Sequence, residues 1–145
     1  MTMNEGQIWR LTMILNLTQH NATPDQIAAG VVDPHGVCAD LLRDLLTFSW
    51  LPTADEIVAR SERIADIALL IGIKERASDY PTPVRAMIGG APYLMPALEQ
   101  SLIARGFDPV YSFSTRETEE HVQPDGSVKK VSVFKHAGFV PCVTT

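Results

Sequence analysis

Hydrophobic residues cluster in short runs along this chain, and polar or turn-forming segments separate these runs. Leu11–Leu17 (LTMILNL) is an apolar run of strand length, and Val84–Ile88 is a second run that ends at two glycines. A third run, Val110–Ser114 (VYSFS), is rich in the β-branched and aromatic residues that favour strands. The run Leu11–Leu17 is short and apolar enough to predict a strand that is buried on both faces of a sheet.

Helix signals lie between these predicted strands. Thr23–Gln26 (TPDQ) combines a capping threonine, a proline at the first helical position and a glutamine that completes a capping box. Apolar residues recur at helical spacing across Asp33–Phe48, and Thr53–Glu56 is a second capping box, which opens a helix reaching about Arg76. A last helix is predicted over Pro96–Gly106, because proline suits a helix start and glycine suits the residue after a helix end.

The end of the chain predicts a hairpin. Thr115–His136 reads as two strands around Pro124–Ser127, which has turn-forming residues. Strands joined by helical crossovers imply a parallel sheet. We therefore predict an α/β fold: a small Rossmann-like three-layer domain over residues 13–145, with a parallel core sheet and a C-terminal antiparallel β-hairpin that extends the sheet or makes a dimer contact. Residues 1–12 are expected to form an N-terminal extension.

Composition narrows the class of protein. The chain has 145 residues, of which 46% are apolar and 20% charged, and this balance is typical of a globular protein. Its longest aliphatic run, Ile67–Ile73, is shorter than the roughly 20 residues that span a bilayer, and no secretory signal is recognisable, so a cytoplasmic location with no membrane partner is expected. Two cysteines, Cys38 and Cys142, are too few for a structural zinc site and are expected to be reduced thiols.

The net charge of −5 argues against binding to duplex nucleic acid, which needs a basic face. It leaves room for a small anionic ligand held by a few local cations. In open α/β sheets ligands bind beyond the carboxyl ends of the strands, which here are Thr18–Asn21, Gly89–Tyr93 and Ser114–Glu117. The candidate ligand contacts from these ends are Thr18, Gln19, Asn21, Gly89, Gly90, Tyr93, Ser114 and Thr115.

Each candidate also has a structural explanation. His20 fits a hydrogen bond to a loop carbonyl equally well, the glycine pair fits a tight turn, and Tyr93 fits the core as well as a platform for stacking on a base. Arg116 can pair with an acidic residue of its own strand, and Lys135 fits a solvated strand face. The glycine pair matches neither common nucleotide-binding motif, and no histidine spacing typical of a metal site occurs, so no metal or cofactor is predicted.

Four segments of the chain occur in an order and spacing that is informative: Leu17–His20 followed by Thr23–Gln26, Met87–Gly89, Ser114–Glu117 with Glu120, and Ser132–His136. Together they resemble one family, the small CRISPR-associated proteins of the ring-nuclease type, which have CARF-like Rossmann folds. The helical region Val31–Tyr80 departs from the compact form of that family, and Gly90 stands where a more polar residue is expected.

The resemblance implies a homodimer that binds a cyclic oligoadenylate and cleaves it without a metal ion. A ribose 2′-hydroxyl attacks the adjacent phosphorus, and the protein holds this geometry and stabilises the developing charge. His20 is the candidate for proton transfer, Gly89 and Gly90 supply backbone N–H groups, and Arg116 or Lys135 supplies positive charge. A module that senses or sequesters the nucleotide without cutting it, and an interaction protein of a mobile element with no active site, are alternatives that the sequence leaves open.

Overall fold

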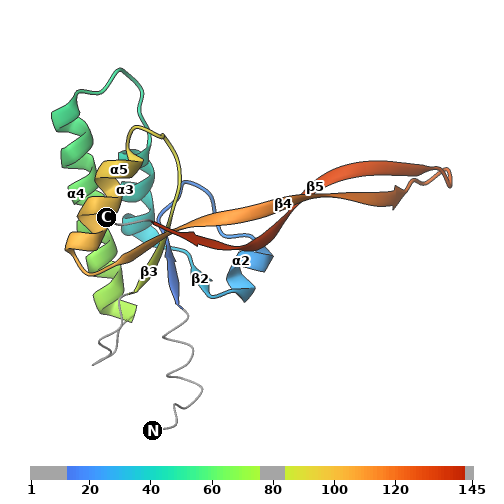
Figure 1. Cartoon of the computed structure of the whole chain (residues 1–145), viewed down its shortest axis with the longest axis horizontal. Coiled ribbons are helices and arrows are strands. Elements are labelled where there is room, and N and C mark those ends of the chain that lie inside the picture. The colour runs from blue at the N-terminus through green and yellow to red at the C-terminus, as the bar shows by residue number, and fades with distance from the viewer. Residues whose placement is uncertain (1–12, 76–83, 143–145) are drawn as a thin grey trace, which may run out of the picture.

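A computed structural model of the protein describes residues 13–75 and 84–142, and one five-stranded sheet organises them (Figure 1). The strand order across the sheet is β2-β1-β3-β4-β5. The first four strands in this order run parallel to one another, and β5 is antiparallel to β4. The strands are β1 (Ile14–Asn16), β2 (Val31–Val32), β3 (Arg85–Ile88), β4 (Asp108–Val122) and β5 (Val128–Pro141). The predicted mixed α/β fold with a C-terminal antiparallel strand pair is confirmed.

The helices are α2 (Pro24–Ala28), α3 (Gly36–Leu46), α4 (Ala54–Glu75) and α5 (Met95–Ala104). Helices α2 and α4 begin where the sequence placed their capping boxes, whereas α3 begins at Gly36, later than the predicted start at Asp33. The Thr23 hydroxyl accepts a hydrogen bond from the Gln26 N–H at 3.2 Å, and the Gln26 side chain accepts one from the Thr23 N–H at 3.0 Å, so the predicted capping box is confirmed. Thr53 caps the longest helix through the Glu56 N–H at 3.2 Å.

The two faces of the sheet are covered unequally. Helices α3, α4 and α5 cover one face, and the core there includes Leu15, Leu17, Ala86, Ile88, Leu42, Ile64, Leu98 and Leu102 (Figure 1). On the other face a smaller cluster of Ile14, Val31, Met87 and Val110 packs against Ala22 and Phe139. The short helix α2 lies on this second side (Figure 1). The lighter cover on this side leaves space for a pocket beside α2.

Strand β2 was missed by the sequence analysis, because a strand of two residues has no periodicity to detect. Val31 and Val32 pair with Ile14 and Leu15 of β1. Since β3 pairs with the other edge of β1, the chain leaves β1 toward one side of the sheet and later returns on its other side. The boundary between β1 and β3 is therefore a topological switch point, where α/β sheets open a crevice at the carboxyl ends of their strands.

Strand β4 is longer than predicted. The third strand was expected to end at Ser114, with a separate hairpin after it, but β4 continues without interruption from Asp108 to Val122. Only Asp108–Tyr111 pairs with β3, and a β-bulge follows at Phe113. The prediction that Ser114–Glu117 ends a strand at the sheet edge is therefore wrong, because β5 pairing carries the strand onward into the hairpin.

The paired residues Ser114–Val122 and Val128–His136 form a ribbon that projects from the rest of the protein and is called the β-arm below (Figure 1). The predicted extension over residues 1–12 and the predicted loop over residues 78–83 lie outside the described residues. Across residues 13–75 and 84–142, no helix has the length and apolar content needed to cross a membrane.

Candidate functional site

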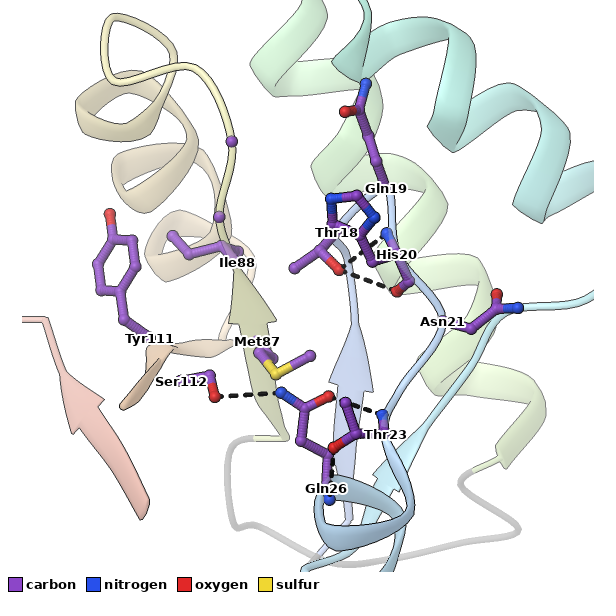
Figure 2. A pocket seen from close by; sticks show the side chains of 12 residues that line it. Thr18, Gln19, His20, Asn21, Thr23, Gln26, Met87, Ile88, Tyr111 and Ser112 are labelled. Carbon is purple, nitrogen blue, oxygen red and sulfur yellow. Dashed lines mark hydrogen bonds between the residues drawn. The ribbon is translucent and has the colours of Figure 1, made fainter. Parts of the chain in front are cut away.

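A cavity of about 380 Å³ opens at the switch point, between the carboxyl ends of β1 and β3 (Figure 2). Cavities of roughly 300–1,000 Å³ are typical of small-molecule sites. Three groups of residues line this pocket. They are Thr18, Gln19, His20 and Asn21 after β1, with Thr23 and Gln26 of α2; Met87, Ile88, Gly89 and Gly90 at the end of β3; and Tyr111 and Ser112 of β4.

The loop after β1 is held by the side chain of Asn16, which is 1% exposed. Its Nδ2 donates to the backbone oxygen of His20 at 2.7 Å and to Oδ1 of Asp33 at 2.8 Å. Its Oδ1 accepts from the Thr18 N–H at 3.0 Å and from the Thr18 hydroxyl at 2.7 Å. Both N–H donors and both lone pairs of the buried amide are satisfied, so the shape of the loop is tied to this one residue.

Asp33, directly after β2, completes the same network. Its Oδ1 and Oδ2 accept hydrogen bonds from the Ala22 N–H at 3.0 and 3.2 Å. The loop is thereby fixed at both ends, by β1 at one side and by β2 at the other. Neither Asn16 nor Asp33 was predicted as a site residue from the sequence. The available signal was an asparagine inside the otherwise apolar run Leu11–Leu17, since a buried amide there requires specific partners.

Asn16 and Asp33 hold the loop after β1 mainly through its backbone atoms, so the His20 side chain is free to face the pocket. The His20 side chain is exposed, and its ring has no hydrogen-bond partner in the described part of the chain. Figure 2 shows Thr18 and His20 on one side of the pocket, with Ile88 and Tyr111 on the other. Histidine accepts and releases protons near neutral pH, so this ring can serve a ligand as donor, acceptor or base.

On the other side of the pocket, β4 is joined to α2 through the side chain of Gln26. Its Nε2 donates to the Ser112 hydroxyl at 3.1 Å, and this oxygen lies 3.2 Å from Nδ1 of His136 (Figure 2 shows the Gln26 contact). The His136 ring is tilted against Phe139, with 4.7 Å between the ring centroids. The capping glutamine therefore has two tasks: Oε1 closes the cap of α2, and Nε2 ties α2 to β4 across the pocket.

Gly89 and Gly90 bring bare backbone to the pocket. Their N–H groups donate to no other group within residues 13–75 and 84–142. Gly90 has a φ of +139°, which side chains disfavour, whereas a Cβ added at Gly89 would meet only Cγ2 of Thr18, at 3.7 Å. Backbone N–H groups without partners favour negatively charged or strongly polar ligand atoms.

Five predicted site residues are placed elsewhere. Tyr93 packs edge-on against Phe48, with 5.2 Å between the ring centroids, and does not line the pocket. Ser114, Thr115, Arg116 and Lys135 belong to the β-arm. The expected strand ends after β1 and β3 therefore meet at the pocket. The third, Ser114–Glu117, lies away from it, because β4 continues past the edge of the parallel sheet.

The two expected cations have partners within the arm. The Arg116 guanidinium lies 5.2 Å from the centroid of the Phe134 ring. Nζ of Lys135 lies 3.2 Å from Oε1 of Glu119 and 3.5 Å from Oε2 of Glu117, and these carboxylates, Glu119 first, raise the pKa of Lys135. None of the residues that line the pocket in the described chain is lysine, arginine, aspartate or glutamate. The expected electropositive site is instead a neutral one.

Two other groups that could react, the Tyr111 hydroxyl and the Cys142 thiol, are kept protonated by their surroundings. The Tyr111 hydroxyl donates to Oε1 of Glu99 at 2.5 Å, and burial together with this contact raises the pKa of Tyr111. Burial, followed by the effect of Glu99, raises the pKa of the Cys142 thiol to about 12. Cys142 is therefore unsuited to act as a nucleophile. Among the described residues, no three histidine, cysteine or carboxylate side chains form a group that could hold a metal ion.

Comparison with models of protein families matches residues 12–140 to the family described as "Uncharacterized protein MJ1673 family". No curated protein and no solved structure matches the chain. The matching description names no activity and does not mention CRISPR-associated proteins, so the ring-nuclease resemblance stays a prediction.

Replacing Asn16 by alanine is predicted to lower the free energy of unfolding by about 2–4 kcal/mol, because the Thr18 N–H and the His20 carbonyl each lose a buried partner. Chemical denaturation measures this change, and hydrogen exchange of the Thr18 and Ala22 amides should accelerate. Asn21→Ala is the matched control, since Asn21 is exposed on the same loop; an equal effect of the two substitutions would show that Asn16 does not organise the loop.

The raised pKa of Cys142 predicts slow alkylation. At pH 8 its reaction with iodoacetamide should be at least about a hundredfold slower in the folded protein than in denaturant, because only the thiolate reacts. The rate should still increase above pH 9, since the thiolate forms only at more alkaline pH. Peptide mass spectrometry of the Cys142 peptide follows the reaction, and equal rates in the folded and denatured chain would contradict the assignment.

Proposed function

The chain belongs to the MJ1673 family, and we propose that it binds a cyclic oligoadenylate in the pocket between β1 and β3 and cleaves it without a metal ion. One observation carries this proposal: an exposed histidine ring and two backbone N–H groups without partners meet in one cavity at the switch point of the sheet. The strand order with this crevice also supports assigning the fold as Rossmann-like.

The dimensions of the pocket suit one unit of such a ligand. A cavity of about 380 Å³ lies at the small end of ligand sites, so it fits one nucleotide of the ring, and the remainder extends past the pocket. Met87 and Ile88, which are 3% and 2% exposed, form an apolar floor of the pocket, while Thr18, Asn21 and Thr23 supply polar groups for a ribose. A lining that combines apolar and polar groups is compatible with one nucleotide.

The chemistry needs a base and a stabilised oxyanion. His20 accepts the proton of a ribose 2′-hydroxyl as its oxygen forms a bond to the adjacent phosphorus. The bond from phosphorus to the 5′-oxygen breaks, that oxygen takes a proton from a water molecule, and a 2′,3′-cyclic phosphate remains. The proton held by His20 then passes to the resulting hydroxide, which restores the water and the neutral imidazole. The N–H groups of Gly89 and Gly90 stabilise the charge on the phosphoryl oxygens, and a positioned base contributes roughly 10²–10⁴-fold to the rate.

A second candidate function, binding without cleavage, is favoured by the neutral pocket. Charge on a phosphorane-like transition state is normally met by cations as well as by N–H groups. Since no cation lines the pocket in the described chain, a sensor or sequestering module of the same shape accounts for the geometry without requiring catalysis.

Incubation with labelled cyclic tetraadenylate in excess EDTA separates the two functions. Turnover by the wild-type protein and a loss of about 10²–10⁴-fold in His20→Ala are expected, with binding retained. His35→Ala is the control, because His35 is exposed at the start of α3 and does not line the pocket. Tight binding without product would support the binding module instead, and full activity of His20→Ala would show that His20 is not the base.

Gly89→Ala tests the role of the bare backbone. The added methyl group meets only Cγ2 of Thr18, at 3.7 Å, so the fold is retained while the methyl narrows access to the N–H groups. Affinity for the ligand is expected to fall about tenfold, or about 1.4 kcal/mol, with an unchanged melting temperature. Gly72→Ala in α4, away from the pocket, is the control; calorimetry showing equal affinities for the two variants would rule out ligand contact at Gly89.

A further inference from the structure

The β-arm lacks support from the rest of the protein. Beyond Ser112, β4 pairs only with β5, and Figure 1 shows the ribbon projecting away from the helices. Ser114–Val122 alone extends about 26 Å at roughly 3.3 Å per residue. A two-stranded hairpin is marginally stable by itself in water, and its edges invite pairing with other chains. A ribbon of this length therefore needs a surface that covers it.

One face of the β-arm is neutralised by its own ion pairs. Lys135 bridges Glu117 and Glu119, and Nε2 of His121 lies 3.1 Å from Oε2 of Glu119. Hydrogen bonds from His121 and Lys135 hold the pKa of Glu119 below its usual range. Because these charges are already paired within the arm, this face is not suited to bind a charged surface of another molecule.

The opposite face, called the open face below, is different. Directly opposed pairs share a face in an antiparallel ribbon, and the pairs here are Arg116 with Phe134, Thr118 with Ser132, Glu120 with Lys130, and Val122 with Val128. Phe134 is 70% exposed and Val122 is 75% exposed. Within the described residues, Glu120 and Lys130 form no ion pair. The open face thus combines uncovered apolar groups with charges that lack a salt-bridge partner.

The open face is complementary to itself. Arg116 and Glu120 lie two positions either side of Thr118 on β4, and Phe134 and Lys130 lie two positions either side of Ser132 on β5. A two-fold axis passing between two stacked arms at the Thr118–Ser132 pair therefore brings opposite charges together. Each of these groups lies only two residues from the axis, which limits the angle that the twist of the ribbon accumulates between facing groups.

We propose that a second copy of this chain covers the open face, forming a homodimer in which two β-arms stack in opposite directions. Each Arg116 then faces Glu120 of the partner subunit, and each Phe134 faces the partner's Lys130, an ion pair and a cation–π contact made twice by symmetry. Stacking in the same direction is disfavoured, because α2 contacts Ser112 on the side that continues as the open face, and the two copies of α2 would collide.

The opposed arrangement also affects the pocket. The partner's arm tip, the turn over residues 124–127, comes to lie beyond Ser114 and His136, next to the pocket wall at Ser112. A second copy of the chain then closes the β4 side of the pocket, whichever ligand the pocket binds. The proposed dimer therefore does not depend on the proposed cleavage activity.

Charge reversal tests this interface by analytical ultracentrifugation at micromolar concentration. The wild-type protein is expected to be a dimer, whereas Arg116→Glu and Glu120→Arg should each be monomeric, because each sets like charges against one another twice. An equimolar mixture of the two variants should restore a heterodimer, which also shows that both are folded. Lys129→Glu is the control for charge on the other face and should remain dimeric.

Crosslinking tests the position of the axis. Thr118→Cys should give a covalent dimer with a short bismaleimide, since stacked sheets lie about 10 Å apart, farther than a disulfide spans. Thr115→Cys on the opposite face, and the wild-type chain with its two native cysteines, are the controls. A monomeric wild-type protein, a mixture of charge variants that stays monomeric, or equal crosslinking of Thr118→Cys and Thr115→Cys would overturn the proposal. The first result would mean that a different macromolecule covers the arm.

Discussion

The candidate site depends on one buried amide, the side chain of Asn16. A polar group that is 1% exposed inside an apolar strand is unfavourable unless each of its hydrogen-bonding atoms has a partner. Asn16 meets this condition by holding backbone and side-chain atoms of the following loop together with Asp33. The same contacts that make its burial tolerable define the shape of the pocket wall. The His20 ring takes no part in these contacts and is therefore left available to a ligand.

The two-residue strand β2 gives this loop its place. By pairing with the outer edge of β1, it turns the β1–β3 boundary into a switch point and brings Asp33 beside Asn16. The lining of the resulting pocket is neutral, so the proposed anionic ligand would be bound by N–H groups and hydroxyls. The basic side chains expected at this site, Arg116 and Lys135, lie instead on an arm whose open face is self-complementary. The proposed ligand site and the proposed subunit interface therefore occupy separate but adjoining surfaces of β4.

Features that depend on local physics were predictable from the sequence, and those that depend on pairing were not. The capping box at Thr23 is a local signal, and it is confirmed with both of its hydrogen bonds. The glycines at the end of β3 and the loop containing His20 follow from strand ends, which short apolar runs mark clearly. The length of β4 was not predictable, because continuation of the strand past Ser114 depends on pairing with β5, which follows later in the chain. An asparagine in the apolar run was a visible signal, but the role of Asn16 depends on its contact with Asp33, which is distant in sequence.

The central claim is that the loop organised by Asn16 and the end of β3 together form a ligand site. The most direct measurement is a ¹H–¹⁵N NMR titration of the wild-type protein with cyclic tetraadenylate. We expect the largest shift changes at the amides of residues 18–22 and at Gly89 and Gly90, with saturation at a defined stoichiometry. Shift changes confined to the surfaces of α3 and α4, or none at saturating ligand, would contradict the claim.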